Sequence, residues 1–227
     1  IVDAGWVEAE RFVADARRNQ TFLVATEGSS DTLVLRHAIQ LLCPETVDFF
    51  RFVDVEEWHQ FSGAGNLLKF AEGLAKIDVH NQIVFLFDND AEGVEAHSKL
   101  SNYALPSNMR TMVLPRLDRF LDFPARGPNG VHNADINGRA AAIECYLDLT
   151  FGARSPAQVT WTNFKKDIAI YHGALDYKGG YIKTFLRQTA ESLEADGYDI
   201  SGVQAVLDAL IAECAAIAEG RDDDFEP

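Results

Sequence analysis

The sequence predicts an α/β protein built on a Rossmann-like parallel sheet of about four strands flanked by helices. Three observations predict this. Short apolar runs alternate with segments of helical periodicity over residues 20–116, and the connections between the runs are too long for hairpins. The run at 83–87 is apolar throughout, as in a strand buried on both faces. Asp88 and Asp90 follow it directly, at the edge where open α/β sheets place ligands.

The elements of this core follow from the spacing of apolar, glycine and proline residues. Each expected strand is short and apolar, and each expected helix has an apolar stripe and is bounded by glycine, proline or aspartate. Strands are expected over residues 21–25, 47–55, 82–87 and 111–114. Helices are expected over residues 3–18, 32–42, 67–74 and 91–103.

The pattern changes beyond residue 116, where prolines and glycines between 124 and 130 interrupt regular structure. The remainder reads as mainly helical, with helical segments expected over residues 140–149, 164–171, 182–195 and 203–218. The organisation expected is therefore an N-terminal helix, a core, a mainly helical extension that completes the site, and a solvated acidic tail, over residues 1–19, 20–116, 117–220 and 221–227.

Composition narrows the class of protein. A net charge of -15 argues against holding nucleic acid by bulk electrostatics, but it does not exclude a nuclease, because cation-binding carboxylates belong to the acidic total. The three cysteines lack metal-ligand spacing and suit reduced thiols in the cytoplasm. No uninterrupted apolar run approaches the roughly 18 residues of a membrane span. Because Ile1 is not an initiator methionine, we expect a preceding N-terminal domain or a partner subunit.

Acidic residues follow two of the expected strands. Glu27 and Asp31 come after the first, and Asp88 and Asp90 after the third. Carboxylate oxygens are the ligands that Mg²⁺ prefers, so the two strand ends together predict a metal site. Two structural alternatives stay open. Asp90 could serve only as the N-cap of the helix expected over residues 91–103, and Asp31 could serve only to complement the dipole of the helix expected over residues 32–42.

Other metals and mechanisms fit the motifs less well. Asp88-Asn89-Asp90 opens like a calcium loop, but Lys99 stands where that loop requires a glutamate. The six histidines are scattered without zinc-ligand spacing, and His132 lies alone in a loop. An apolar strand ending in Asp-x-Asp also occurs in haloacid dehalogenase-like phosphatases. There the motif lies on the first strand and a hydroxyl residue follows, whereas here it lies on the third and Ala91 follows.

Three motifs occur in order: Glu27-Gly28-x-x-Asp31, Gly63-x-Gly65-Asn66 and Asp88-x-Asp90. Together they resemble the Toprim domain over residues 20–116, about half of the chain. The spacing of Glu27 and Asp31 and the long extension look most like the branch of overcoming-lysogenization-defect nucleases of bacterial anti-phage defence. By this resemblance Glu27, Asp31, Asp88 and Asp90 are ligands of Mg²⁺ or Mn²⁺, and the loop 63–66 shapes the wall of the site.

The same branch often carries a further acid and a lysine beyond the core. Glu144 is the candidate acid, and Lys178 and Lys183 are the candidate lysines that would neutralise charge on the scissile phosphate. The alternative, that Glu144 and Lys183 are ordinary helix-surface residues, stays open.

The resemblance implies a Mg²⁺- or Mn²⁺-dependent endonuclease that hydrolyses phosphodiester bonds of DNA or RNA at a two-metal carboxylate site. It would act in the cytoplasm, away from membranes, as the effector part of a larger bacterial defence protein, and a homo-oligomer is compatible with it. Two alternatives remain: a non-catalytic Toprim module that senses or binds a partner, and the haloacid dehalogenase-like phosphatase.

Overall fold

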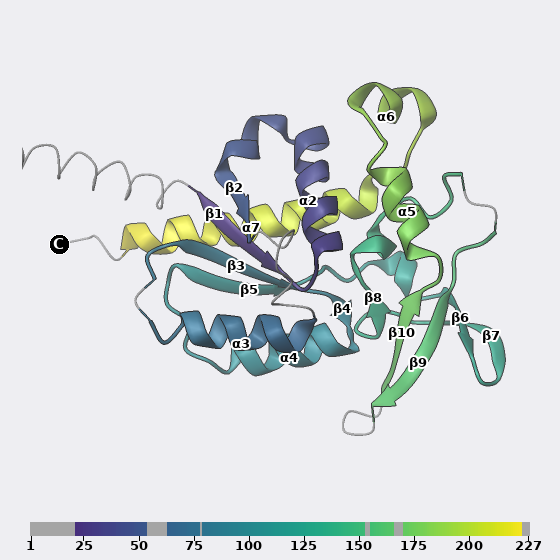
Figure 1. Ribbon diagram of the computed structural model, residues 1–227, viewed down its shortest axis with the longest axis horizontal. Coiled ribbons are helices and arrows are strands. Elements are labelled where there is room, and N and C mark those ends of the chain that lie inside the picture. The colour runs from purple at the N-terminus through teal and green to yellow at the C-terminus, as the bar shows by residue number, and fades with distance from the viewer. Residues whose placement is uncertain (1–20, 54–62, 78, 153–154, 166–169, 224–227) are drawn as a thin grey trace, which may run out of the picture.

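A computed structural model describes residues 21–53, 63–77, 79–152, 155–165 and 170–223 (Figure 1). The chain forms a parallel sheet covered by helices on both faces, with a second, largely antiparallel sheet beside it. The helix expected over residues 3–18 and the last residues of the acidic tail lie outside the described residues.

The first sheet has four strands in the order β2-β1-β3-β5, and all neighbouring pairs are parallel. Phe22 pairs with both Phe50 and Gln82, and Ile83 pairs with Met109. The predicted α/β class and the four parallel strands are therefore confirmed. Their bounds are β1 (Phe22–Thr26), β2 (Phe50–Phe52), β3 (Gln82–Phe87) and β5 (Met109–Val113).

Strand β3 is apolar throughout because helices cover both sides of it. Ile83, Phe85 and Phe87 are buried in the cluster under α3 (Ala64–Leu74) and α4 (Ala91–Ser101). Val84 and Leu86 belong to the opposite cluster, with α2 (Ser29–Leu42) and α7 (Ser201–Asp223). Burying each large side chain contributes about 1.5–3 kcal/mol, so the central strand is a main source of stability.

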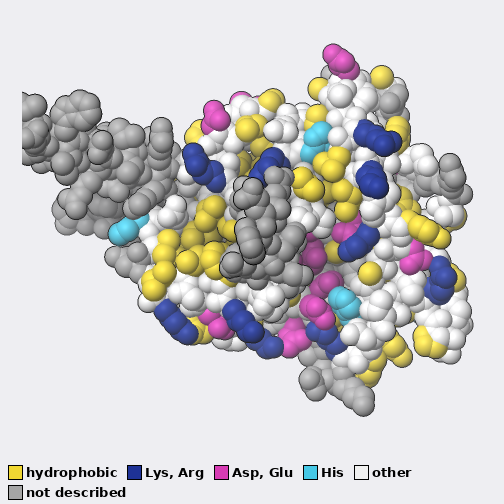
Figure 2. Space-filling model, in the orientation of Figure 1, with side chains coloured by type: hydrophobic (Ala, Val, Ile, Leu, Met, Phe, Trp, Pro, Cys, Tyr) yellow, Lys and Arg dark blue, Asp and Glu magenta, His cyan; other side chains and the backbone are white. Residues whose placement is uncertain are grey.

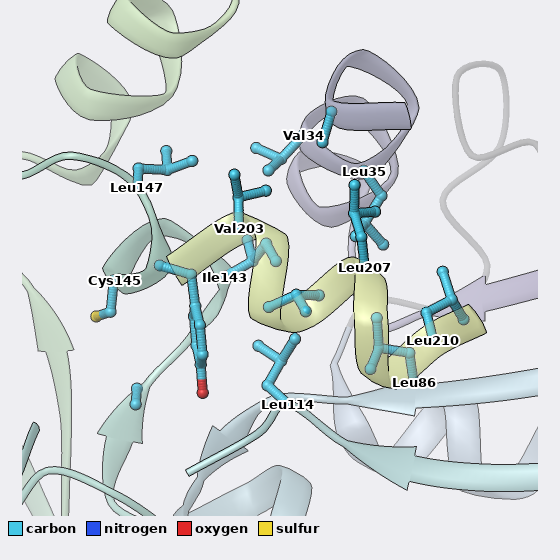
Figure 3. Close-up of a cluster of buried hydrophobic side chains, with 14 of the residues drawn as sticks. Val34, Leu35, Leu86, Leu114, Ile143, Cys145, Leu147, Val203, Leu207 and Leu210 are labelled. Carbon is cyan, nitrogen blue, oxygen red and sulfur yellow. The ribbon is translucent and has the colours of Figure 1, made fainter. Parts of the chain in front are cut away.

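Helix α7 packs along the face of the sheet that α2 also covers. Figure 3 shows its Val203, Leu207 and Leu210 between Leu35 of α2 and Leu86 of β3. By length and composition, residues 201–220 are the one stretch of helix in the described parts of the chain that could cross a membrane. One side of this helix packs in the core through residues such as Leu207 and Leu210, whereas Ile211 is exposed.

The strand expected over residues 47–55 is shorter than predicted. Residues Pro44–Phe49 form a 3₁₀ helix, η1, and strand β2 (Phe50–Phe52) pairs with β1, with one further backbone bond from the Val53 N–H to the Val24 carbonyl at 3.0 Å. Residues 54 and 55 of the expected strand lie outside the described residues. The Thr46 hydroxyl donates to the Cys43 carbonyl at 2.8 Å, a local bond that competes with strand pairing. Phe49 is consequently left 51% exposed at the edge of the sheet.

The expectation of a mainly helical extension is wrong for residues 117–175. Here a short 3₁₀ helix, η2 (Asp118–Phe120), is followed by a second sheet in the order β10-β9-β6-β7. Threonines alternate with an apolar and an aromatic residue from Val159 to Thr162, which favours a strand over a helix. The strands are β6 (Phe123–Gly127), β7 (Gly130–Ala134), β9 (Val159–Lys165) and β10 (Ile170–Leu175).

Residues 140–149, expected as a helix, form the short strand β8 (Ala140–Ala141) and the 3₁₀ helix η3 (Ile143–Tyr146). The helical part of the extension begins later, and it consists of α5 (Lys178–Phe185), α6 (Ala190–Asp196) and α7. Helix α7 continues to Asp223, so the first residues of the expected acidic tail are helical.

A short strand joins the two halves of the chain. Strand β4 (Asn89–Asp90) pairs antiparallel with β8, and the buried Asn89 side chain accepts a bond from the Gly138 N–H at 2.7 Å. Its amide also donates to Asn137 Oδ1 at 3.1 Å and to the Tyr146 hydroxyl at 3.3 Å. The segment after β3 is thereby fixed against the segment that leads to Glu144.

Candidate metal centre

The candidate site lies where the direction of the strand crossovers reverses. Helix α2 covers one face of the sheet and α3 and α4 cover the other (Figure 1). In open α/β sheets, ligands bind in the crevice outside the carboxyl ends of the two strands at such a reversal, which here are the adjacent strands β1 and β3. Glu27 follows β1 and Asp88 follows β3. The Asp88 backbone N–H donates to Glu27 Oε1 at 2.9 Å, which joins the two strand ends directly.

Gly93 allows the first turn of α4 to approach these two acids. A Cβ at position 93 would lie 2.7 Å from Glu27 Oε1 and would also overlap the Asp88 carbonyl oxygen. On the opposite side, the Gly63 N–H donates to the Glu27 carbonyl at 3.0 Å, with Gly63 at φ +86°. The segment 63–66, expected as a loop, is instead the N-cap and first residues of α3, because the helix begins at Ala64. Its contact with Glu27 is this backbone hydrogen bond from Gly63.

Asp31 lies in the first turn of α2. Its Oδ2 accepts the Gly28 N–H at 2.9 Å, and its Oδ1 accepts the Ser30 hydroxyl at 3.3 Å. The bond from Gly28 satisfies a backbone N–H at the helix start, and an acid in the first turn complements the helix dipole, so the structural role considered for this residue is realised. The same carboxylate is buried and close enough to Glu144 for their charges to interact.

Asp90 divides its two oxygens between two roles. Oδ1 accepts the N–H groups of Glu92 and Gly93, each at 2.8 Å, and so caps α4. Oδ2 lies 3.8 Å from His172 Nδ1, on β10 of the second sheet. The helix-capping role is thus realised through one oxygen, while the other faces the junction between the two halves.

Glu144 and Lys178 bring the second half of the chain into the site. Glu144, in η3, has only 3% of its side chain exposed, and its Oε1 lies 3.2 Å from Lys178 Nζ at the start of α5. Lys178 is 57% exposed. Lys183 is also exposed, but no contact among the described residues joins it to the acids. Of the two candidate lysines, the structure brings Lys178 to the acids.

Burial and mutual repulsion dominate the electrostatics of the acids. Burial, with the charges of Asp90 and Asp31, raises the pKa of Glu27 to about 8. Burial and the charge of Glu144 raise the pKa of Asp31 to about 7. The pKa of Asp88 lies well above its usual range, through burial first and then through the charges of Asp31, Glu27, Asp90 and Glu144.

The pKa of the lysine is raised as well, but for a lysine this favours the charged form. The charge of Glu144 raises the pKa of Lys178, with further contributions from Asp88 and Asp31. The five acids and this lysine therefore behave as one electrostatic unit, although they come from both halves of the chain. Figure 2 shows acidic side chains gathered near the middle of one face of the molecule, with basic and histidine side chains beside them.

The donor set fits a hard divalent cation. Five carboxylates in a partly dehydrated crevice repel one another, and Mg²⁺ or Mn²⁺ would relieve that repulsion through the oxygen ligands these ions prefer. In the described part of the chain, no three histidine, cysteine, aspartate or glutamate side chains stand in a ready-made coordination geometry. What points to a cation is therefore the gathering of acids whose ionised forms repel one another, because a bound cation would stabilise those ionised forms.

His172 and Lys165 are site neighbours that the sequence did not reveal. His172 faces Asp90, and Lys165 Nζ lies 3.4 Å from Glu92 and 3.3 Å from Glu95 on α4. Both come from the hairpin β9–β10, in a region expected to be helical. The alternation of residues in β9 was the one signal that pointed to a strand there. His132 lies on β7, exposed to solvent.

Comparisons of the chain with protein-family models, with curated proteins and with solved structures found no match. The resemblance to the Toprim domain therefore remains an inference from the acidic motifs and the arrangement of the strands that carry them.

Proposed function

We propose that the chain is a metal-dependent nuclease with a Toprim-like core, which hydrolyses phosphodiester bonds in DNA or RNA. The observation that carries this proposal is the meeting of five carboxylates and one lysine at the crossover reversal, with the pKa of the most buried acids raised. Strongly shifted pKa values in a crevice are typical of functional sites. A purely structural acid cluster would be expected to contain more compensating cations.

Two groups of ligands are available in this crevice. Glu27 and Asp88 would hold one cation, and Asp31, Asp90 and Glu144 would hold a second. When bound, Mg²⁺ or Mn²⁺ would neutralise the carboxylates, polarise a phosphate oxygen and activate water for hydrolysis. Ions of this kind also explain how an acidic protein tolerates a phosphate in its crevice.

The side chains of the chain itself orient the reactants. Lys178 is held at Glu144 by the 3.2 Å ion pair, yet more than half of its side chain is open to solvent, so a phosphate can reach the ammonium group. There it would balance charge that develops in the transition state. The Asp88 N–H fixes the Glu27 carboxylate, and the helix N–H groups fix Asp90, so both acids are oriented before substrate binds.

The direct test is cleavage of plasmid DNA, single-stranded DNA and structured RNA with Mg²⁺ or Mn²⁺ and with EDTA. We expect metal-dependent cleavage that Glu27→Gln and Asp88→Asn reduce by about 100-fold or more, the size of effect typical for removal of one catalytic electrostatic group. Glu219→Gln, an exposed residue near the end of α7, is the matched control and should cleave as the unaltered chain does. Equal cleavage by all three variants would overturn the proposal.

Two further measurements separate the alternatives. If Mg²⁺ and Mn²⁺ at millimolar concentration gave neither binding heat nor a gain in thermal stability, a non-catalytic module would be favoured. Turnover of a small phosphate ester that depends on Asp88 but not on Glu27 would favour a phosphatase.

We further propose that this nuclease is the effector part of a larger bacterial defence protein. The test is to repeat the cleavage assay with that larger protein.

A further inference from the structure

A pocket of about 450 Å³ lies on α5, beside the lysine of the proposed site. Its walls include the aromatic rings of Phe151, Tyr177 and Tyr181, and small or hydroxyl residues complete it: Gly180, Ser155 and Thr184. Its volume lies within the range of small-molecule pockets, about 300–1,000 Å³. The pocket therefore combines flat apolar surfaces with a few hydrogen-bonding groups.

The pocket adjoins the proposed site through α5. Tyr181 and Thr184 lie three residues apart on α5, so they share one face of the helix, and Tyr177 directly precedes its first turn. Lys178 is the first residue of α5 and follows Tyr177 in the chain, and its ammonium group lies 3.2 Å from Glu144 Oε1. A ligand whose phosphate lies at Lys178 would therefore lie next to the pocket, because Tyr177, which lines the pocket, directly precedes Lys178 in the chain.

Tyr177 is unusual in both exposure and backbone conformation. Its side chain is 81% exposed, and it lies in the left-handed region at φ 58° and ψ 23°. Among the described residues it is the one non-glycine with a positive φ. Such a conformation costs a tyrosine about 1 kcal/mol or more, and strained backbone of this kind clusters at functional sites. Packing does not explain the ring, because most of it faces solvent.

We propose that this pocket receives an unpaired nucleobase, stacked on Tyr177, from the nucleic acid whose phosphate lies at Lys178. This inference rests on the proposed nuclease function and assigns its substrate: a single strand, or a strand with an unpaired nucleotide beside the cleaved bond. Aromatic side chains bind bases of any sequence by stacking, and bases in a duplex are not available for it.

The charge of the chain supports the same conclusion. With a net charge of -15, the protein has little bulk electrostatic attraction for nucleic acid. Stacking provides affinity that does not depend on positive charge. The hydroxyl groups of Ser155, Tyr181 and Thr184 offer donors and acceptors to the edge of a base.

The test uses a pentanucleotide with 2-aminopurine at its centre and methylphosphonate linkages, which are uncharged and resist hydrolysis. A 2′-O-methyl version tests RNA-like sugars in parallel. Stacking on an aromatic ring quenches 2-aminopurine, so we expect quenching that saturates with the intact chain. Tyr177→Gly removes the ring and relieves the positive φ, and it should weaken binding by about 10-fold or more, as expected for loss of one base stack. Tyr177→Trp should retain binding.

Tyr103→Ala, at an exposed tyrosine beyond the end of α4, is the matched control and should bind as the unaltered chain does. Absence of quenching with the intact chain, or equal affinity of Tyr177→Gly and the intact chain, would overturn the proposal. Because the probe carries no scissile phosphate, this result does not depend on catalysis. Quenching by a chain that cleaves no substrate would leave the pocket assigned and would reject only the nuclease function.

Where cleavage is observed, a second measurement bears on the substrate. The intact chain should cut a single strand about 10-fold or more faster than the same sequence in a duplex, and Tyr177→Gly should lose most of this preference. Equal rates on single strand and duplex would overturn the proposal.

Discussion

Binding of a divalent cation to this site should release protons, and the number can be worked out from the pKa values. With a pKa of about 8, Glu27 carries about 0.9 proton at pH 7, and with a pKa of about 7, Asp31 carries about 0.5. A cation binds the ionised carboxylates, so both must lose these protons. Binding at pH 7 should therefore release about 1.4 protons from these two acids, and more once Asp88 is included.

The assay is calorimetric titration of Mn²⁺ into the chain at pH 7 in two buffers of different ionisation enthalpy. The difference between the two binding enthalpies gives the number of protons released. Glu27→Gln removes one titrating group and also removes a charge that raises the pKa of Asp88, so it should lower this number by about 0.9 or more, whereas Glu219→Gln should leave it unchanged. Apparent affinity should rise with pH between 6 and 8, because fewer protons then compete with the ion.

Two results would refute the reasoning. Binding without proton release would mean that the acids are already ionised at pH 7, so that burial and repulsion do not act on them as described. Equal proton release by Glu27→Gln and by the unaltered chain would place the ion away from the crevice between β1 and β3.

Three further predictions concern stability and catalysis. The pKa of Glu27 is higher in the folded chain than in the unfolded chain, so between about pH 4.5 and 8 the folded chain binds more protons than the unfolded chain does. The free energy of unfolding, measured with urea in the presence of EDTA, should therefore fall as the pH rises through this window. Gly93→Ala should lower the free energy of unfolding by about 1–3 kcal/mol and impair Mn²⁺ binding, because the added Cβ would overlap Asp88 and Glu27. Gly73→Ala, in open space on α3, is the control and should be neutral or slightly stabilising. Equal effects of the two substitutions would contradict the close approach of α4. In cleavage assays Lys178→Met should lose activity about 100-fold while Lys183→Met retains it, and the reverse result would reassign the lysine.

The core of the fold could be predicted because local and global signals agree there. The bounds of β3 match the expected strand residue by residue, since an unbroken apolar run between a polar residue and an acid has one simple interpretation. The placement of Glu27 and Asp88 at the same edge of the sheet also follows from the parallel strands, whereas the adjacency of their strands comes from the strand order that the structure shows. The bounds of the edge strand β2 were harder to predict, because local hydrogen bonds such as that from Thr46 to Cys43 decide whether a short apolar segment pairs as a strand or turns into a 3₁₀ helix.

The second sheet could not be predicted in the same way. Its strands are short, and its pairings join segments far apart in sequence: β6 pairs with β9 through Ala125 and Val159. A periodic pattern of a few residues does not separate such strands from short helices. For the same reason the approach of His172 to Asp90 was missed, and the choice between two lysines five residues apart needed the helix that carries them.

Asn89 has a consequence for how this protein can be divided. The first 116 residues contain four of the five acids, yet the asparagine between Asp88 and Asp90 finds its side-chain partners at Asn137, Gly138 and Tyr146. A shortened chain ending at residue 116 would remove all three of these partners and with them the contact that holds the segment between Asp88 and Asp90 against the second half of the chain. A boundary drawn after the first sheet would therefore cut through a buried hydrogen-bond network, so the two halves are better kept together in any shortened or exchanged form of this protein.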